Sequence, residues 1–359
     1  MMRRLFAVLV AILAFSCASS ARDPNDLSKM QSVYKGEVGE SPVGVIPDAA
    51  LHDAQRDKDV TVTIEYPTRS ANNPLLLFSP GFGGSNDAYV GLSSYWASQG
   101  FVVVRVSHAD AGRKLTDAQD FWSTQTESDR RNRVRDLTFI IDSLDKIEKD
   151  YPELQGKIDH AKIGVAGHSY GAYTALLVAG MKTFPDGTSY ADPRVKAVVA
   201  MSPQGPDETR GLTRESFASI NVPVLFLTGS RDQGMAESET PEWRSQAFEL
   251  APAGDKWLIV VEGARHSTFI GRYDAFIEAA ARERIPPTVD MPRGTDPSSA
   301  GSRLPRNDAR RPRSEAQMIN ERALFSTIKS DALAFFDAYL KADTKGREAL
   351  EKAPGVKKK

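Results

Sequence analysis

Short apolar runs separated by longer amphipathic segments recur along most of the chain. Each continuous run of four or five apolar residues predicts a buried strand, at 75–78, 101–104, 163–166, 197–201, 224–227 and 258–261. An earlier stretch alternates instead, with apolar side chains at Val60, Val62, Ile64 and Tyr66. Period-two alternation predicts a strand with one solvent-facing side, as in an edge hairpin that precedes a parallel sheet.

The segments between these runs have the length and spacing of helices. Residues 87–99, 126–150 and 172–179 lie between predicted strands, and the second of them places apolar residues three and four apart. A last helix is predicted over 318–340, where Leu324, Ile328, Leu333 and Phe336 recur. Strands that alternate with helices predict an α/β fold, a doubly wound and mostly parallel sheet with helices on both faces.

Three segments fall outside this rhythm. Residues 22–57 are mostly polar and interrupted by glycine and proline, which predicts an irregular arm before a folded domain at 58–343. Residues 281–314 hold six prolines and eight arginines against four acidic residues, which predicts a solvated insertion loop within that domain. Residues 344–359 end in three lysines and are expected to form a solvated basic tail.

The N-terminus has the three parts of an export signal. Arg3 and Arg4 precede an apolar stretch, and small residues follow it up to residue 21. Cys17, the only cysteine, stands where bacterial lipoproteins carry a lipid, while the small residues 19–21 offer an ordinary cleavage site. The expected location is outside the cytoplasm, as a periplasmic, membrane-anchored or secreted protein.

Charge and histidine content limit the classes of partner. The net charge of −1 provides no electrostatic basis for nucleic-acid binding. His108 and Asp110 follow the strand at 101–104 and are conceivable metal ligands, but no second pair at ligand spacing accompanies them. No metal and no cofactor is therefore expected.

The sequence Gly167-His168-Ser169-Tyr170-Gly171 stands between a predicted strand and a predicted helix. A chain that turns this sharply holds its apex residue strained and exposed, and glycines on either side leave room for the crossing backbone. Ser169 at this apex is the candidate nucleophile.

Two further groups are needed for nucleophilic catalysis by a serine, an oxyanion hole and an acid–base pair. The glycine-rich loop after the strand at 75–78 makes the backbone N–H of Phe82 a candidate oxyanion donor, together with that of Tyr170. Asp232 follows the strand at 224–227 and is the favoured acid, with Asp207 as a rival. His266 is the only histidine after Asp232 and is the candidate base.

The order serine, aspartate, histidine is that of the α/β-hydrolase superfamily, which the sequence resembles over 51–343. Within it, the chain is similar to bacterial hydrolases related to dienelactone hydrolase, to platelet-activating factor acetylhydrolase and to cutinase-like polyester esterases. The resemblance is carried by Leu51-His52-Asp53, Tyr66-Pro67, Ser79-Pro80-Gly81-Phe82, Trp96-Ala97-Ser98-Gln99-Gly100-Phe101, Gly167 to Gly171, Thr228 to Asp232 and Gly263-Ala264-Arg265-His266. It implies the nucleophile, acid and base roles for Ser169, Asp232 and His266.

These observations predict a serine hydrolase of carboxylic esters with small-molecule or lipid ester substrates. The stretches between the three triad candidates are too short for a large lid, so a shallow pocket walled by Phe82, Tyr170 and Trp122 is expected, with a preference for short acyl groups. A peptidase resembling prolyl oligopeptidases and a catalytically silent surface-binding lipoprotein are the alternatives, because a fold alone does not define a function.

Overall fold

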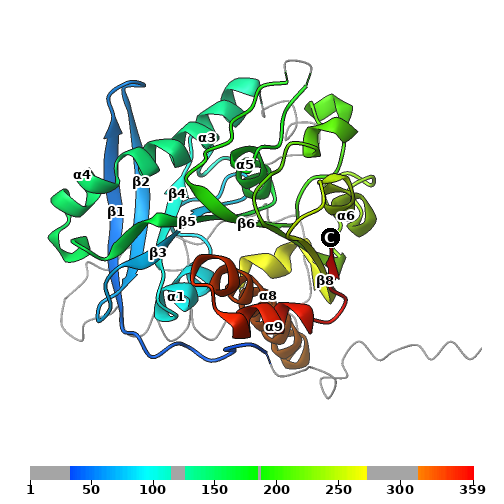
Figure 1. Cartoon of the computed structure of the whole chain (residues 1–359). Coiled ribbons are helices and arrows are strands. Elements are labelled where there is room, and N and C mark those ends of the chain that lie inside the picture. Colours follow the sequence, from blue (N-terminus) through cyan, green and yellow to red (C-terminus); the bar gives the residue numbers. More distant parts are fainter. Residues whose placement is uncertain (1–32, 115–125, 185–186, 273–313) are drawn as a thin grey trace, which may run out of the picture. The chain divides into compact units, whose positions relative to one another are not determined.

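The strands form one sheet in the computed structural model, which describes residues 33–114, 126–184, 187–272 and 314–359. Within these residues the sheet has nine strands in the order β1-β2-β4-β3-β5-β6-β7-β8-β9 (Figure 1). Their bounds are β1 Val43–Asp53, β2 Lys58–Pro67, β3 Asn73–Ser79, β4 Val102–Ser107, β5 Ile158–His168, β6 Val195–Met201, β7 Val224–Arg231, β8 Lys256–Arg265 and β9 Lys357–Lys358.

The central strands run parallel and the outer ones antiparallel. Strands β4, β3, β5, β6, β7 and β8 pair in parallel, with Leu77 of β3 opposite Val104 of β4 and Val165 of β5. Strands β1, β2 and β9 pair antiparallel to their neighbours. The doubly wound, mostly parallel sheet is therefore confirmed, and all its parallel strands end at the same edge.

Helices cover both faces of this sheet (Figure 1). One apolar cluster includes side chains from α3 Glu127–Asp142, α4 Leu144–Asp150, α5 Tyr170–Val178 and α6 Pro241–Leu250. The other includes side chains from α1 Val90–Ser98, α8 Glu315–Leu340 and α9 Thr344–Glu351. Short 3-10 turns stand at η2 Pro152–Leu154, η3 Glu208–Arg210, η4 Arg214–Phe217 and η5 His266–Ile270.

Strand β3 shows why a continuous apolar run is required at the centre. Leu75 and Leu77 belong to the first apolar cluster, whereas Leu76 and Phe78 belong to the second. Successive side chains of a strand point to opposite faces, so a strand covered by helices on both faces must be apolar at every position.

The expectation of an irregular arm over 22–57 is wrong for its last part. Strand β1 occupies Val43–Asp53 and pairs with β2, with a register shift between Ile46 and Ala49. Pro47 and Asp48 fall inside this shift, and Asp48 has a φ of 49°. Because a bulge accommodates a residue that cannot join the ladder, the proline interrupts the strand pattern without ending the strand.

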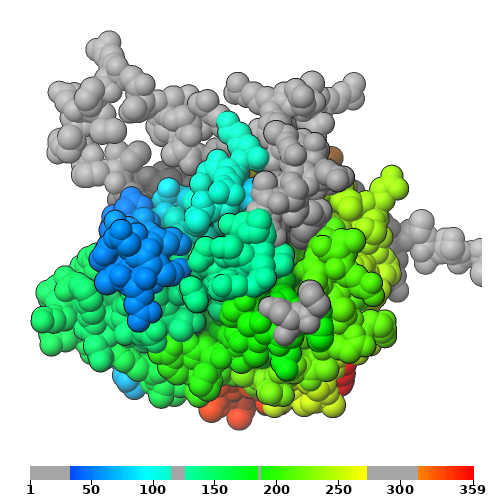
Figure 2. Space-filling model, turned by 90° about the horizontal axis from the view of Figure 1, so that it is seen from above, coloured from blue at the N-terminus to red at the C-terminus, as the bar shows by residue number. Residues whose placement is uncertain are grey.

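The hairpin of β1 and β2 is tied to helix α3 by charge. Arg56 in the turn and Lys58 at the start of β2 lie 2.7 and 2.8 Å from an oxygen of Asp136, which is buried on α3. Figure 2 shows the blue tip of this hairpin beside the turquoise surface around α3.

The expectation of a solvated basic tail over 344–359 is also wrong. Helix α9 and strand β9 occupy this segment, and the backbones of Lys359 and Lys256 exchange hydrogen bonds of 3.0 and 3.1 Å. The ammonium of Lys358 lies 4.5 Å from the ring centroid of Trp257. Lysine stems cover apolar surface while their charged ends stay in water, so a lysine-rich strand can close a sheet edge.

The export segment 1–21 and nearly all of the loop 281–314 lie outside the described residues. Within the parts of the chain that the structure describes, no helix combines the length and apolar character needed to cross a membrane.

Candidate active site

Ser169 occupies a strained turn between β5 and α5. Its φ and ψ are 54° and −118°, a conformation that side-chain-bearing residues rarely adopt, and its side chain is partly exposed. A Cβ on Gly167 would overlap the carbonyl of Gly171, and a Cβ on Gly171 would overlap that of Ser79. The two glycines therefore permit the crossing of backbones that the turn requires, as the sequence predicted.

The glycine-rich loop after β3 packs directly against this turn. The carbonyl of Gly81 accepts from the N–H of Gly84 at 3.0 Å, which orients the peptide that carries the Phe82 N–H. On either side, the N–H of Gly81 donates to the Tyr89 hydroxyl at 3.3 Å and that of Gly83 to Asp110 at 2.9 Å. The two proposed donor residues are neighbours, since the rings of Phe82 and Tyr170 lie 6.3 Å apart.

Asp232 and His266 meet at the same edge of the sheet. Nδ1 of His266 lies 2.8 Å from Oδ1 of Asp232, which is fully buried, while His266 keeps 31% of its side chain exposed. The Thr228 hydroxyl donates to the other carboxylate oxygen at 2.9 Å. The segments after β7 and β8 thus bring together the candidate acid and the candidate base, which are distant in sequence.

The environment keeps Asp232 ionised. Burial acts to raise its pKa, but the hydrogen bond and charge of His266 and the guanidinium of Arg244 hold that pKa well below its usual range. An ionised carboxylate only accepts hydrogen bonds, so Nδ1 of His266 carries a proton. In the neutral imidazole the lone pair then lies on Nε2, the atom that a general base would use.

The rival acid, Asp207, is engaged elsewhere. Its carboxylate caps η3 by accepting from the Thr209 N–H at 3.0 Å, and it forms a 2.9 Å ion pair with Arg210. The structure therefore pairs the imidazole with Asp232, while Asp207 stabilises a turn.

His168 joins the serine turn to His266. It is buried, its Nδ1 lies 2.8 Å from the Tyr89 hydroxyl, and its ring centroid lies 4.7 Å from that of His266. Burial and the charge of His266 lower the pKa of His168 well below its ordinary value, so it is neutral near pH 7. Its packing role agrees with the expectation from sequence, and it places His266 beside the residue that precedes Ser169.

Arg244 is a site residue that the sequence patterns did not reveal. This buried guanidinium on α6 lies 3.1 Å from Oδ1 of Asp232 and donates to the carbonyls of Asp232, Ser202 and Pro203. It holds the loop that carries the acid against the segment after β6. Nothing about an arginine within an amphipathic helix distinguishes this role in sequence.

The structure gives His108 and Asp110 partners other than a metal. Both ring nitrogens of His108 are engaged, Nε2 at 3.0 Å from Ser79 and Nδ1 at 2.9 Å from Asp136. Asp110 pairs with Arg133 at 2.6 Å. These partners use the atoms that would otherwise coordinate an ion.

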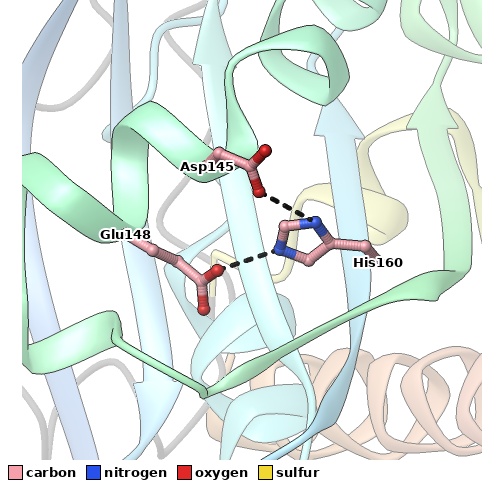
Figure 3. Close-up of side chains that lie close together, drawn as sticks. All are labelled: Asp145, Glu148 and His160. Carbon is pink, nitrogen blue, oxygen red and sulfur yellow. Dashed lines mark hydrogen bonds and ion pairs between the residues drawn. The ribbon is translucent and has the colours of Figure 1, made fainter.

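A second group of possible metal ligands, Asp145, Glu148 and His160, lies on the surface between α4 and β5 (Figure 3). Nδ1 of His160 faces Asp145 at 3.6 Å and Nε2 faces Glu148 at 3.0 Å. The two ring nitrogens of His160 therefore face different carboxylates, one from each side of the ring.

Trp122, expected as a pocket wall, lies outside the described residues. A shallow hollow that includes Asn73, Gly100 and Lys162 lies at the amino ends of the parallel strands. It is at the sheet edge opposite Ser169 and shares none of the candidate site residues.

The comparisons with known proteins agree with this geometry. The chain matches the alpha/beta hydrolase family over residues 76–319, more than half of its length. The chain therefore belongs to the alpha/beta hydrolase family.

Among characterised relatives, the platelet-activating factor acetylhydrolase of Cavia porcellus is 23% identical over 230 residues, covering 55% of this chain and 48% of that protein. The cutinase est2 of Thermobifida alba is 23% identical over 205 residues, covering 57% of this chain and 56% of that protein. The chain thus spans about half the length of both relatives. Together, family and relatives support a hydrolase of the esterase or lipase type.

Proposed function

We propose that the protein is a serine hydrolase that cleaves carboxylic esters through an acyl-enzyme. The observation that carries this proposal is the 2.8 Å pair of Asp232 and His266 beside the strained turn at Ser169. A buried ionised acid, a partly exposed imidazole and a serine at a strand-to-helix turn are the parts that this chemistry needs.

In this mechanism, Nε2 of His266 takes the proton of the Ser169 hydroxyl as Oγ attacks the ester carbonyl. The negative charge on the tetrahedral oxygen is stabilised by the backbone N–H groups of Phe82 and Tyr170. The imidazolium then donates its proton to the departing alkoxide, which leaves as an alcohol. Water adds to the acyl-enzyme by the same route, with His266 as base, and the acid is released as Ser169 regains its proton.

Asp232 stabilises the imidazolium that forms in each half of the cycle. It keeps its negative charge throughout, because the proton stays on the imidazole, and it holds the tautomer with Nδ1 protonated. Arg244 and Thr228 fix the orientation of its carboxylate.

The substrate class proposed is esters with short acyl groups on a variable alcohol. The described stretch from Ser169 to Asp232 is occupied by α5, β6, η3, η4 and the whole of β7, and that from Asp232 to His266 by α6 and β8. No large lid stands in these stretches as described, and the name of one relative, an acetylhydrolase, agrees with a short acyl group. We expect kcat/KM to fall from acetyl and butyryl to palmitoyl p-nitrophenyl esters.

A fluorophosphonate probe tests the nucleophile directly. It should label the wild-type protein at Ser169 and fail to label Ser169→Ala, whose kcat should drop by up to ~10⁶. Ser267→Ala, which removes an exposed hydroxyl beside His266, is the control and should keep both labelling and activity. Labelling that persists in Ser169→Ala contradicts the proposal, and cleavage of peptide anilides in preference to esters would instead favour a peptidase.

Export of the protein is part of the proposal and rests on the signal-like residues 1–21. Mass spectrometry of the mature chain should find either a lipid on Cys17 or an N-terminus near residue 22. An intact Met1 in protein isolated from the organism that naturally produces it would contradict export.

A further inference from the structure

A buried arginine on α3 connects the two segments that carry the proposed oxyanion donors. Nη2 of Arg133 donates to the hydroxyl of Ser79 at 3.2 Å and to the carbonyl of Pro80, at the start of the glycine-rich loop. Its Nε donates to the hydroxyl of Thr174 on α5 at 3.1 Å. One rigid, planar guanidinium therefore contacts both the loop that precedes Phe82 and the helix that begins at Tyr170.

The same guanidinium lies against Tyr170 itself, with its central carbon 4.4 Å from the ring centroid. Its remaining end, Nη1, pairs with Asp110 at 2.6 Å, and both side chains are buried. Asp110 in turn accepts from the N–H of Gly83 at 2.9 Å. Arg133 and Asp110 thus hold the loop from both sides of Phe82.

Hydrogen bonds that connect Asp136, His108, Ser79 and Arg133 support this arrangement. Burial and the charge of Arg133 lower the pKa of His108 to about 4, so its ring is neutral near pH 7. Because the neighbouring Asp136 has a lowered pKa of about 2 and only accepts, Nδ1 of His108 donates to it. The Ser79 hydroxyl then donates to Nε2 of His108 and accepts from Arg133. Each of these hydrogen bonds therefore has a defined donor and a defined acceptor.

We propose that Arg133, held by Asp110, is a positioning residue that aligns the backbone N–H groups of Phe82 and Tyr170 as one oxyanion hole. This inference rests on the proposed serine hydrolase function. The two donors come from separate segments, and a hole works only when both point at the place where charge develops in the transition state. Arg133 bonds to the loop and to helix α5 at once.

Misalignment of these donors should lower kcat and leave KM nearly unchanged, because the oxyanion exists in the transition state and not in the bound ester. A displacement of the order of 1 Å can cost roughly 10²-fold in rate. A purely structural role would instead lower the unfolding temperature without a selective effect on kcat.

The test compares Arg133→Lys, Asp110→Asn and Thr174→Val with the wild type, at a temperature where each variant is folded by circular dichroism. Lysine keeps the positive charge but has no fork to reach both segments, so a tenfold or greater loss of kcat for p-nitrophenyl butyrate is expected. Asp110→Asn should behave similarly, and Thr174→Val, the mildest change, should cost a few-fold. KM should stay within about twofold in all three.

Binding of n-butylboronic acid supplies an independent measurement, because its tetrahedral adduct on Ser169 places an oxygen in the hole. Its dissociation constant should rise by about the factor by which kcat falls. The matched control is Glu65→Gln, which weakens a comparably buried pair with Arg105 in β2 and β4 and should change stability alone.

The inference is overturned if the folded variants keep kcat and boronate affinity within twofold of the wild type, or if Glu65→Gln reproduces their losses. If Arg133→Lys and Asp110→Asn do not fold, the kcat and boronate affinity of Thr174→Val test the inference. A wild-type protein that fails to hydrolyse the ester and to react with fluorophosphonate removes the proposed function and this inference with it. An active wild type with unaffected variants removes the inference only.

Discussion

Asp232 shows how one carboxylate is distinguished from its neighbours by its contacts. We expect Asp232→Asn to lower kcat by about 10⁴-fold, because the amide can donate to the imidazole and so favours the tautomer with the proton on Nε2. The measurement is steady-state hydrolysis of p-nitrophenyl acetate near pH 8. Circular dichroism should accompany this measurement, because asparagine keeps the shape but removes the negative charge beside the buried Arg244.

Asp207→Asn is the matched control, because Asp207 follows the preceding strand and was the alternative acid. It caps η3 and pairs with Arg210, so its replacement should cost a modest amount of stability and leave kcat within about threefold. A large loss in Asp207→Asn together with an active Asp232→Asn would reverse the assignment.

Helix α8 carries a carboxyl group with an unusual pKa. Asp331 is partly buried, its Oδ2 has no hydrogen-bond partner within the described residues, and burial raises its pKa to about 7. The folded state thus holds the proton more tightly than the unfolded chain, whose carboxyl has a pKa of 3.8. Stability is therefore lost progressively as the pH rises from about 4 through 7.

We accordingly expect Asp331→Asn to raise the free energy of unfolding at pH 8 by on the order of 2 kcal/mol, and by much less at pH 4. Urea denaturation at the two pH values measures both. Asp337→Asn on the same helix is the control with opposite sign, because Asp337 accepts from Lys35 at 2.7 Å and from Tyr34 at 2.9 Å. Equal destabilisation by both substitutions would contradict this account.

For the whole molecule, two buried neutral histidines lower the stability in mild acid. Burial lowers the pKa of His108 to about 4 and that of His168 well below its ordinary value, whereas both have a pKa of 6.5 when unfolded. Below pH 6.5 the unfolded chain binds more protons than the folded one, so stability falls as the pH decreases. Each histidine should contribute a loss on the order of 2 kcal/mol between pH 6.5 and 5.

Denaturant unfolding of Asp331→Asn at pH 7.5 and pH 5 measures this loss, because Asp331 in the wild type binds a proton on folding and gains stability as the pH falls over the same range. The carboxylates with lowered pKa, Asp136 and Asp232, act in a separate window below about pH 4, where the unfolded chain begins to protonate them. His52→Gln, which changes an exposed histidine, should leave the difference between the two pH values unaltered. A free energy of unfolding that is constant from pH 7.5 to 5 would disprove the buried neutral state.

Short sequence patterns predicted the central strands of the sheet and the serine turn. Strands buried on both faces must be apolar throughout, as in β3, and a turn that crosses its own backbone needs glycine at positions 167 and 171. Both requirements act within a few residues, so they can be read from short patterns. The placement of Ser169 between a strand and a helix followed from them.

The contacts between polar groups could be seen only in the folded structure. Arg133 pairs with Asp110 and reaches Ser79, although the three lie on α3, after β4 and at the end of β3. Likewise, β1 and β9 are strands because β2 and β8 offer them open edges. A buried charge is stable only with a partner, and an edge strand only with a neighbour. The partners of Arg133 and of β9 are distant in sequence, so no local pattern reveals them. Strand β1 pairs with the next strand along the chain, but the bulge at Pro47 interrupts its pattern.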